Sequence, residues 1–233
     1  MACSAPAGPA LEGAQIRHGM RGAVGAIEKV NIENDVNCTV IGNAPAIGIC
    51  GSGLIDAAAA MLKSTVMNPS GLLQADKRDN LPDSLSQRFS KTDDGKDQFT
   101  LVKKDESGRD EDIVLTQNDI RQLQLAKGAI VSGIIMLQKV MEIADEELDE
   151  LMLCGGFGNY ISIQSAVDIK LLPNLPVQKI TYVGNAAHLG AQMALLSEDE
   201  RHRADDIAKE INHVALATHP DFQEIFVEAL KFG

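Results

Sequence analysis

The stretch Leu151–Tyr160, LMLCGGFGNY, says most about the fold of this chain. Its apolar start, Leu151–Cys154, predicts a short buried strand, and the three glycines that follow predict a tight turn. A second strand, Lys179–Val183, precedes a Gly-Asn turn and an apolar helix over Ala186–Leu196. Strands that alternate with helices are typical of an α/β sheet with helices on its faces. We therefore predict an α/β fold, in which ligands bind at the carboxyl ends of the strands.

Two further glycine-rich turns lie upstream, at Ala7–Gly13 and Gly48–Gly53. The second runs into Leu54–Leu62, whose alanines and leucines predict a helix. The N–H groups at such a helix start attract anions such as phosphate. None of the three turns has the P-loop pattern, which excludes a P-loop, and none has the full dinucleotide-binding pattern, which disfavours a Rossmann site.

Residues 66–115 differ from the rest in their prolines, glycines and mixed charges. We expect an insertion there, with a hairpin that pairs Phe99–Lys103 with Asp112–Leu115. Thr116 and Asp119 then predict a capping box at the start of a long amphipathic helix. We expect residues 1–196 to form one lobe, and residues 197–233 to form C-terminal helices packed on it.

The amino-acid composition disfavours two kinds of partner, nucleic acids and membranes. The 33 acidic residues outnumber the 21 basic ones and give a net charge of −12, which disfavours nucleic acid. We find no run of about 18–20 apolar residues and no signal peptide, so we expect no membrane partner. The four cysteines lack zinc-type spacing, which indicates reduced thiols in a cytoplasmic protein.

Five stretches carry a resemblance to a known family. They are CSAPAGPALEGAQIRHGM (3–20), GICGSGLIDAAAAML (48–62), LTQNDIRQLQLAKGAI (115–130), CGGFGNYI (154–161) and VGNAAHLGA (183–191). In this order they resemble the C-terminal ATPase region of reductive activators of corrinoid proteins. LCGGFGNY itself resembles the adenosine motif of the superfamily that unites acetate and sugar kinases, heat-shock chaperone ATPases and actin. The resemblance covers nearly the whole chain and implies one RNase H-like half of a two-lobed, actin-type ATPase.

This resemblance implies a function for the complete protein. Such activators bind Mg-ATP between their lobes and drive the one-electron reduction of Co(II) to Co(I) in a partner corrinoid protein. They commonly carry a ferredoxin domain with a two-iron two-sulfur cluster, but the cysteine spacing here does not match one. The two D-x-G-T turns that bind phosphate in this superfamily are absent too. We therefore expect a C-terminal fragment that is inactive alone, with catalytic residues at least partly upstream. The sequence does not fix the oligomeric state, and a homodimer is permitted.

The resemblance also assigns residues to the nucleotide. It implies that one set lines the site: Gly155, Gly156, Phe157, Gly158, Asn159, Lys127, Gly8, Gly13, Gly51, Ser52 and Gly53. Glu12 is expected to hold a metal ion through a water molecule, as Mg²⁺ sites commonly do.

The residues alone leave other interpretations open. The glycines can serve simply as turns, Asn159 and Ser52 as helix caps, and Glu12 as a first-turn carboxylate. Lys127 can be an exposed lysine on an amphipathic helix. The chain as a whole can be a non-catalytic binding module that keeps the fold, or a small-molecule kinase of the same superfamily. Mg-ATP affinity that falls when Gly156 is replaced by a bulky residue would count against the binding module.

Overall fold

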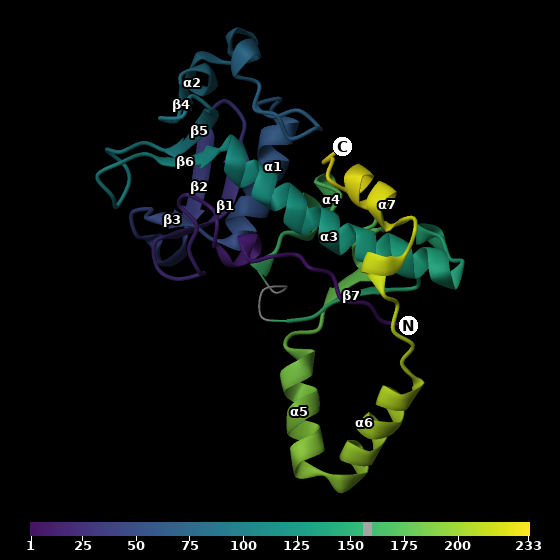
Figure 1. Ribbon diagram of the computed structural model, residues 1–233. Coiled ribbons are helices and arrows are strands. Elements are labelled where there is room, and N and C mark those ends of the chain that lie inside the picture. Colours follow the sequence, from purple (N-terminus) through teal and green to yellow (C-terminus); the bar gives the residue numbers. More distant parts are fainter. Residues whose placement is uncertain (156–159) are drawn as a thin grey trace.

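The structure is a computed structural model that describes residues 1–155 and 160–233 (Figure 1). Its first sheet has the order β2-β1-β3. The central strand β1 (Ala26–Ile32) runs antiparallel to β2 (Val36–Val40) and parallel to β3 (Gly48–Ile49). Helix α1 (Gly51–Lys63) begins two residues after β3 and packs on β1. This strand–turn–helix unit matches the predicted glycine-rich helix start.

A second sheet, of order β4-β5-β6, follows α1 and is antiparallel throughout. Its elements and the short helices before it are η3 (Ala75–Asn80), α2 (Asp83–Ser86), β4 (Phe89–Lys91), β5 (Asp97–Val102) and β6 (Ile113–Thr116). The predicted hairpin pairing is present, with Phe99 opposite Leu115. Phe89 packs edge-on against Phe99 at 5.1 Å between ring centroids, which ties β4 to β5.

The long helix α3 (Gln117–Met141) leads away from the second sheet. Its predicted capping box is confirmed, because Thr116 and Asp119 exchange the two hydrogen bonds that define this motif. By length and composition α3 is apolar enough to cross a membrane, but half of that stretch is buried inside the fold. It packs against α7 (Phe222–Ala229), so α3 is a core helix here.

The third sheet is a parallel pair that corresponds to the two strands predicted first. β7 (Leu151–Leu153) pairs with β8 (Ile180–Tyr182). The strand β7 is present, but its predicted burial is wrong, because Met152 is exposed and Leu151 and Leu153 are only partly buried. Short helices flank the two strands: η4 (Asp145–Glu147), α4 (Ile163–Asp168) and η6 (Val177–Lys179). α4 packs on α1, which joins this part of the chain to the first sheet. The central core contains fully buried side chains from β1, α1, β5, β6 and α3, among them Ile27, Ile55, Phe99, Leu115 and Leu123.

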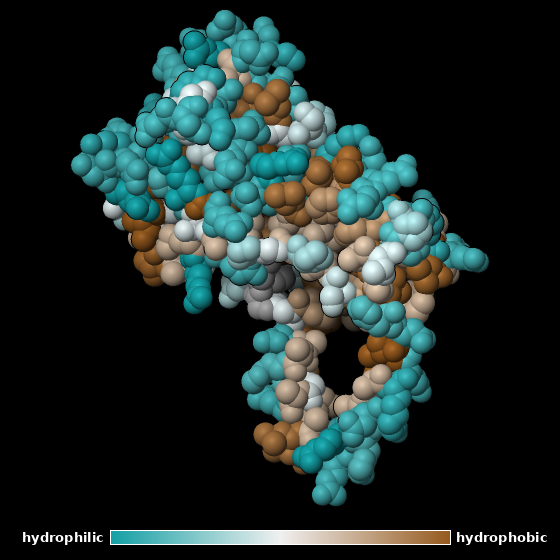
Figure 2. All heavy atoms as spheres, viewed as in Figure 1, coloured by the Kyte–Doolittle hydropathy of each residue, from teal (hydrophilic) through white to brown (hydrophobic). Residues whose placement is uncertain are grey.

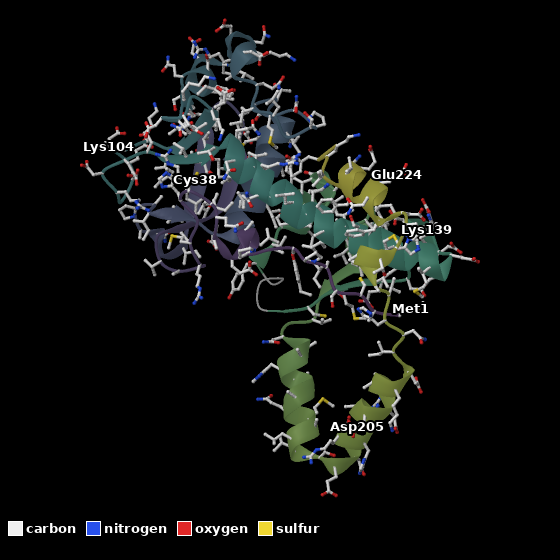
Figure 3. All side chains as sticks on the ribbon, in the orientation of Figure 1. Met1, Cys38, Lys104, Lys139, Asp205 and Glu224 are labelled. Atoms are coloured by element: carbon white, nitrogen blue, oxygen red, sulfur yellow. The ribbon has the colours of Figure 1, made fainter. Side chains whose placement is uncertain are left out.

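Helices α5 (Ala186–Leu196) and α6 (Glu198–Glu210) form an arm that projects from this body (Figure 1). Neither helix has a buried residue. Figure 2 shows apolar atoms along α5 and an opening between the two helices. Charged side chains such as Asp205 line α6 (Figure 3).

The arm departs from the expectation that residues 197–233 pack on the lobe. The chain returns to the body through η7 (Leu216–Thr218), and α7 then lies along α3. α6 instead pairs with α5. The reason is composition, because α6 (EDERHRADDIAKE) has only two alanines and one isoleucine to offer a core face.

Candidate functional site

A pocket of about 600 Å³ lies at the start of α1. Volumes of about 300–1,000 Å³ are usual for small-molecule sites. It brings together three residues from two of the predicted glycine-rich turns, namely Glu12 from the first and Gly51 and Ser52 from the second. Its other lining residues are Leu11, Met20, Arg21, Gly22, Glu28, Ile41, Cys50 and Tyr160.

The N-terminus of α1 forms one wall of this pocket. The N-cap residue Cys50 makes no side-chain cap, and the first turn contains no acidic residue. The first amides of a helix have no intrahelical acceptor, and the helix dipole is positive at this end. The amides of Gly51 and Ser52 are therefore suited to an anion in the pocket.

The structure changes the interpretation of two neighbouring residues. Ser52 is not the N-cap, because it is the second residue of α1, and its hydroxyl lies 3.2 Å from the Cys50 thiol. Gly53 does not line the pocket within the described residues. A Cβ there would lie 2.2 Å from the Ile27 carbonyl oxygen, so Gly53 lets α1 approach β1 closely. The turn sequence predicts a helix start but not this long-range contact.

Charged side chains surround the anion-binding wall. Arg21 is exposed, and it makes no hydrogen bond or ion pair with the residues that the structure describes. Glu12 lies in the one-turn helix η1 (Ala10–Glu12), and Glu28 lies on β1. A cation beside two carboxylates and free amides fits a polyphosphate accompanied by a divalent metal ion, since the metal would offset the carboxylate charges. Sequence reasoning missed Arg21 and Glu28 because neither belongs to a recognisable spacing.

The remaining upstream glycines have different surroundings. Gly13 has a φ of +84°, and a Cβ on it would lie 2.5 Å from the backbone nitrogen of Met20. It therefore lets the chain close against one wall of the pocket. Gly8 (φ +69°) has open space around it and is not among the described residues that line the pocket.

The Gly-Gly turn is only partly described. Gly155 has a φ of +105°, and its N–H donates to the carbonyl of Gly184 at 2.7 Å, which joins the turns after β7 and β8. Gly156, Phe157, Gly158 and Asn159 lie outside the described residues. Tyr160, directly after them, lines the pocket. The N-cap of α4 is Ser162, whose hydroxyl accepts the N–H of Ser165, so this helix starts later than a cap at Asn159 would require.

Lys127 is neither in this pocket nor on an exposed helix face. Its side chain is 1% exposed, and Nζ donates to the carbonyls of Ala229 at 2.7 Å and Lys231 at 2.5 Å. Nζ also lies 5.7 Å from the centre of the Phe232 ring. Burial lowers the pKa of this ammonium to about 8. Lys127 thus binds the C-terminal end of the chain to α3, a contact that the helical period cannot predict.

The cysteines do not form a cluster site. Cys50 is buried, Cys154 is exposed, and Cys3 and Cys38 are half-buried on other segments. Across residues 1–155 and 160–233, no group of three or more His, Cys, Asp or Glu side chains is placed to hold a metal ion. The described residues therefore do not fit a two-iron two-sulfur cluster.

Comparison with known proteins shows to which family this chain belongs. A family model described as the C-terminal domain of RACo, the ASKHA domain, matches residues 1–233. The corrinoid activation enzyme RamQ of Eubacterium limosum is 38% identical over 99% of this chain and 39% of its own. A [Co(II) methylated amine-specific corrinoid protein] reductase of Methanosarcina barkeri is 25% identical over 98% of this chain and 42% of its own.

A solved structure agrees with these matches. A reductive activator for corrinoid, iron-sulfur protein has a TM-score of 0.87 and 36% identity, over 99% of this chain and 36% of that one. The chain thus spans about two fifths of the length of the relatives that it matches. It has the actin-like fold of the acetate and sugar kinase, heat-shock chaperone and actin superfamily, and it belongs to the family of C-terminal ASKHA domains of the corrinoid reductive activators.

Proposed function

We propose that this chain is the C-terminal part of an ATP-dependent activator that reduces Co(II) to Co(I) in a corrinoid protein by one electron. The observation that carries the proposal is the pocket at the start of α1, where free helix amides, Arg21 and Glu12 surround one space. The relatives' names supply the partner class, a corrinoid protein.

Each pocket residue has a role in this proposal. The amides of Gly51 and Ser52 donate hydrogen bonds to a phosphate group, and Arg21 adds a positive charge at the rim. Glu12 holds a magnesium-bound water, which is a common role for a carboxylate near Mg²⁺. Nucleotide binding would then bias the position of this half relative to the rest of a longer chain. In this proposal the chain is one RNase H-like half, and residues 66–115 are an insertion in it.

We assign electron transfer to a part of the activator outside this chain. Because the four cysteines, all of which the structure describes, do not form a cluster that could hold iron and sulfide, no electron-carrying step is assigned to this chain. The same proposal includes a cytoplasmic location and reduced thiols. Sedimentation of the purified chain would detect a homodimer.

The test is a calorimetric titration of the chain with Mg-ATP. Arg21→Ala removes the free cation, and we expect Kd to rise about 10-fold, which corresponds to about 1.4 kcal/mol. Arg203→Ala is the matched control, since Arg203 lies exposed on α6, and it should leave Kd unchanged. Gly156→Val probes the adenosine motif and should weaken binding as well. A wild-type chain that does not bind Mg-ATP, or an Arg21→Ala variant that binds as well as the control, would contradict the proposal.

A further inference from the structure

The Asp119 carboxylate makes one contact more than a helix cap requires. It is 1% exposed. Its Oδ2 accepts the backbone N–H and the hydroxyl of Thr116, both at 2.8 Å, which completes the capping box. Its Oδ1 accepts the backbone N–H of Arg17 at 2.9 Å, from a segment 102 residues away. The second oxygen therefore joins the start of α3 to the N-terminal segment.

Arg17 lies in a closed loop, Gly13–Gly19, which we call the pocket loop. Its two ends touch, because a Cβ on Gly19 would lie 1.9 Å from the carbonyl oxygen of Gly13. The residues immediately outside these ends are Glu12 and Met20, and both line the pocket. A displacement of the pocket loop therefore moves two walls of the pocket together.

The pocket loop carries strain that its anchors must hold. Gln15 has a φ of +64°, in the left-handed region that costs a non-glycine residue about 1 kcal/mol or more. One end is fixed to β3, where Ile49 donates to His18 O and Met20 donates to Ile49 O. The Arg17 guanidinium donates to Gln98 Oε1 at 3.4 Å, which is long for a hydrogen bond, so this contact is weak. The Asp119–Arg17 bond is thus the strongest polar anchor of the loop's far side within the described residues.

We propose that Asp119 is a positioning residue for the nucleotide pocket. By holding the Arg17 N–H, it fixes the pocket loop and so sets the places of Glu12 and Met20, although Asp119 itself does not line the pocket. The inference rests on the proposed function of that pocket. It also makes the start of α3 and the pocket parts of one hydrogen-bonded unit.

The test compares two variants of the same capping box. Asp119→Asn leaves one carboxamide oxygen for which the N–H groups of Thr116 and Arg17 compete, so the contact with Arg17 is weakened together with the cap. Thr116→Val removes the capping hydroxyl but leaves both carboxylate oxygens, including the one that holds Arg17. Both variants weaken the cap, and only Asp119→Asn weakens the anchor. The readouts are the Kd for Mg-ATP and the amide hydrogen-exchange rate of Arg17.

We expect Asp119→Asn to raise Kd about 10-fold and to speed Arg17 exchange at least as much, whereas Thr116→Val changes Kd by less than about 2-fold. Mg-ATP should also slow Arg17 exchange in the wild-type chain, a measurement that stands even if Asp119→Asn does not fold. Three results would each overturn this inference but not the proposed function. They are equal Kd values in wild type and Asp119→Asn, an equal rise in Kd in both variants, and an Arg17 exchange rate that does not change when Mg-ATP is added. A wild-type chain that does not bind Mg-ATP overturns the proposed function too.

Discussion

Replacing Lys127 by Met tests how the C-terminal end of the chain is held on α3. The ammonium donates to the carbonyls of Ala229 and Lys231, just where α7 ends. Met has a similar length and apolar character, so it refills most of the volume and leaves little cavity. What it removes is the donor for two carbonyl oxygens, together with one buried charge.

The two effects oppose each other, and their sizes decide the outcome at pH 7. Hydrogen bonds from a charged donor contribute about 1.5–3 kcal/mol each, so two of them contribute about 3–6 kcal/mol, and about 4.5 kcal/mol at the middle of that range. A lysine pKa that falls from 10.5 to about 8 corresponds to a burial cost of about 3 kcal/mol at neutral pH. The net loss for Lys127→Met is therefore about 1–2 kcal/mol. For a chain of this size that lowers Tm by about 2–8 °C.

The pH dependence gives a sharper test. In the unfolded chain Lys127 keeps its proton up to about pH 10.5, but in the folded chain only up to about pH 8. Between these values the unfolded state binds more protons, so the wild-type chain gains stability as pH rises. The neutral amine still has N–H groups for both carbonyls. The loss caused by Lys127→Met should therefore grow by about 2 kcal/mol between pH 7 and 9.5.

Lys139→Met is the matched control. Lys139 lies on the same helix and binds Asp221 near the start of α7, but it is half exposed (Figure 3). A surface ion pair contributes less than about 1 kcal/mol, so Lys139→Met should lose less stability than Lys127→Met. Thermal melts at four pH values, with hydrogen exchange on residues 222–233, compare the two variants. A loss for Lys127→Met that is no larger than the control's, or that stays constant with pH, would refute the reasoning.

The remaining predictions concern α1 and the arm. Gly53→Ala should destabilise the chain by about 2 kcal/mol or more in chemical denaturation, because its Cβ would meet the Ile27 carbonyl at 2.2 Å. Gly190→Ala, at a helical glycine with open space around it, should instead stabilise the chain by about 0.5–1 kcal/mol, and the same sign for both would contradict the close-approach argument. Leu189→Glu with Met193→Glu on α5 should leave Tm within about 2 °C of wild type, since neither side chain is buried. The same double variant should bind less of a dye that reports exposed apolar surface, and a large drop in Tm would mean that α5 is covered in solution.

Local patterns predicted the local structure. The strands predicted at Leu151–Cys154 and Lys179–Val183 and the capping box at Thr116 depend on residues close together in the sequence, and the structure contains all three. The pocket was predictable in part, since Glu12, Gly51 and Ser52 do meet.

The predictions that failed share a physical cause, which is contact between segments that lie far apart in the sequence. Lys127 is buried by residues about 100 positions later, and Gly53 faces a carbonyl on β1. The apolar pattern of α5 indicates a covered helix, yet none of its residues is buried, although α6 packs beside it. Periodicity shows which face of an element is apolar, but it cannot show which partner meets that face.

The distribution of polar partners supports the choice of site. Buried polar groups in folded proteins are nearly always paired, and here Arg88, Asp119 and Lys127 have several partners each. His18 is an exception, since burial lowers its pKa and both ring nitrogens lack hydrogen-bond partners in the described part of the chain.

The pocket at the start of α1 shows the opposite pattern. Its amides, its arginine and its two glutamates are placed together without internal partners among the described residues. The first amides of α1 have no intrahelical acceptor, and the charged side chains beside them are held by no partner within residues 1–155 and 160–233, so all of them are free to contact a ligand. For this reason, a failure of Mg-ATP to bind would call for another anionic ligand at the same amides rather than for a different site.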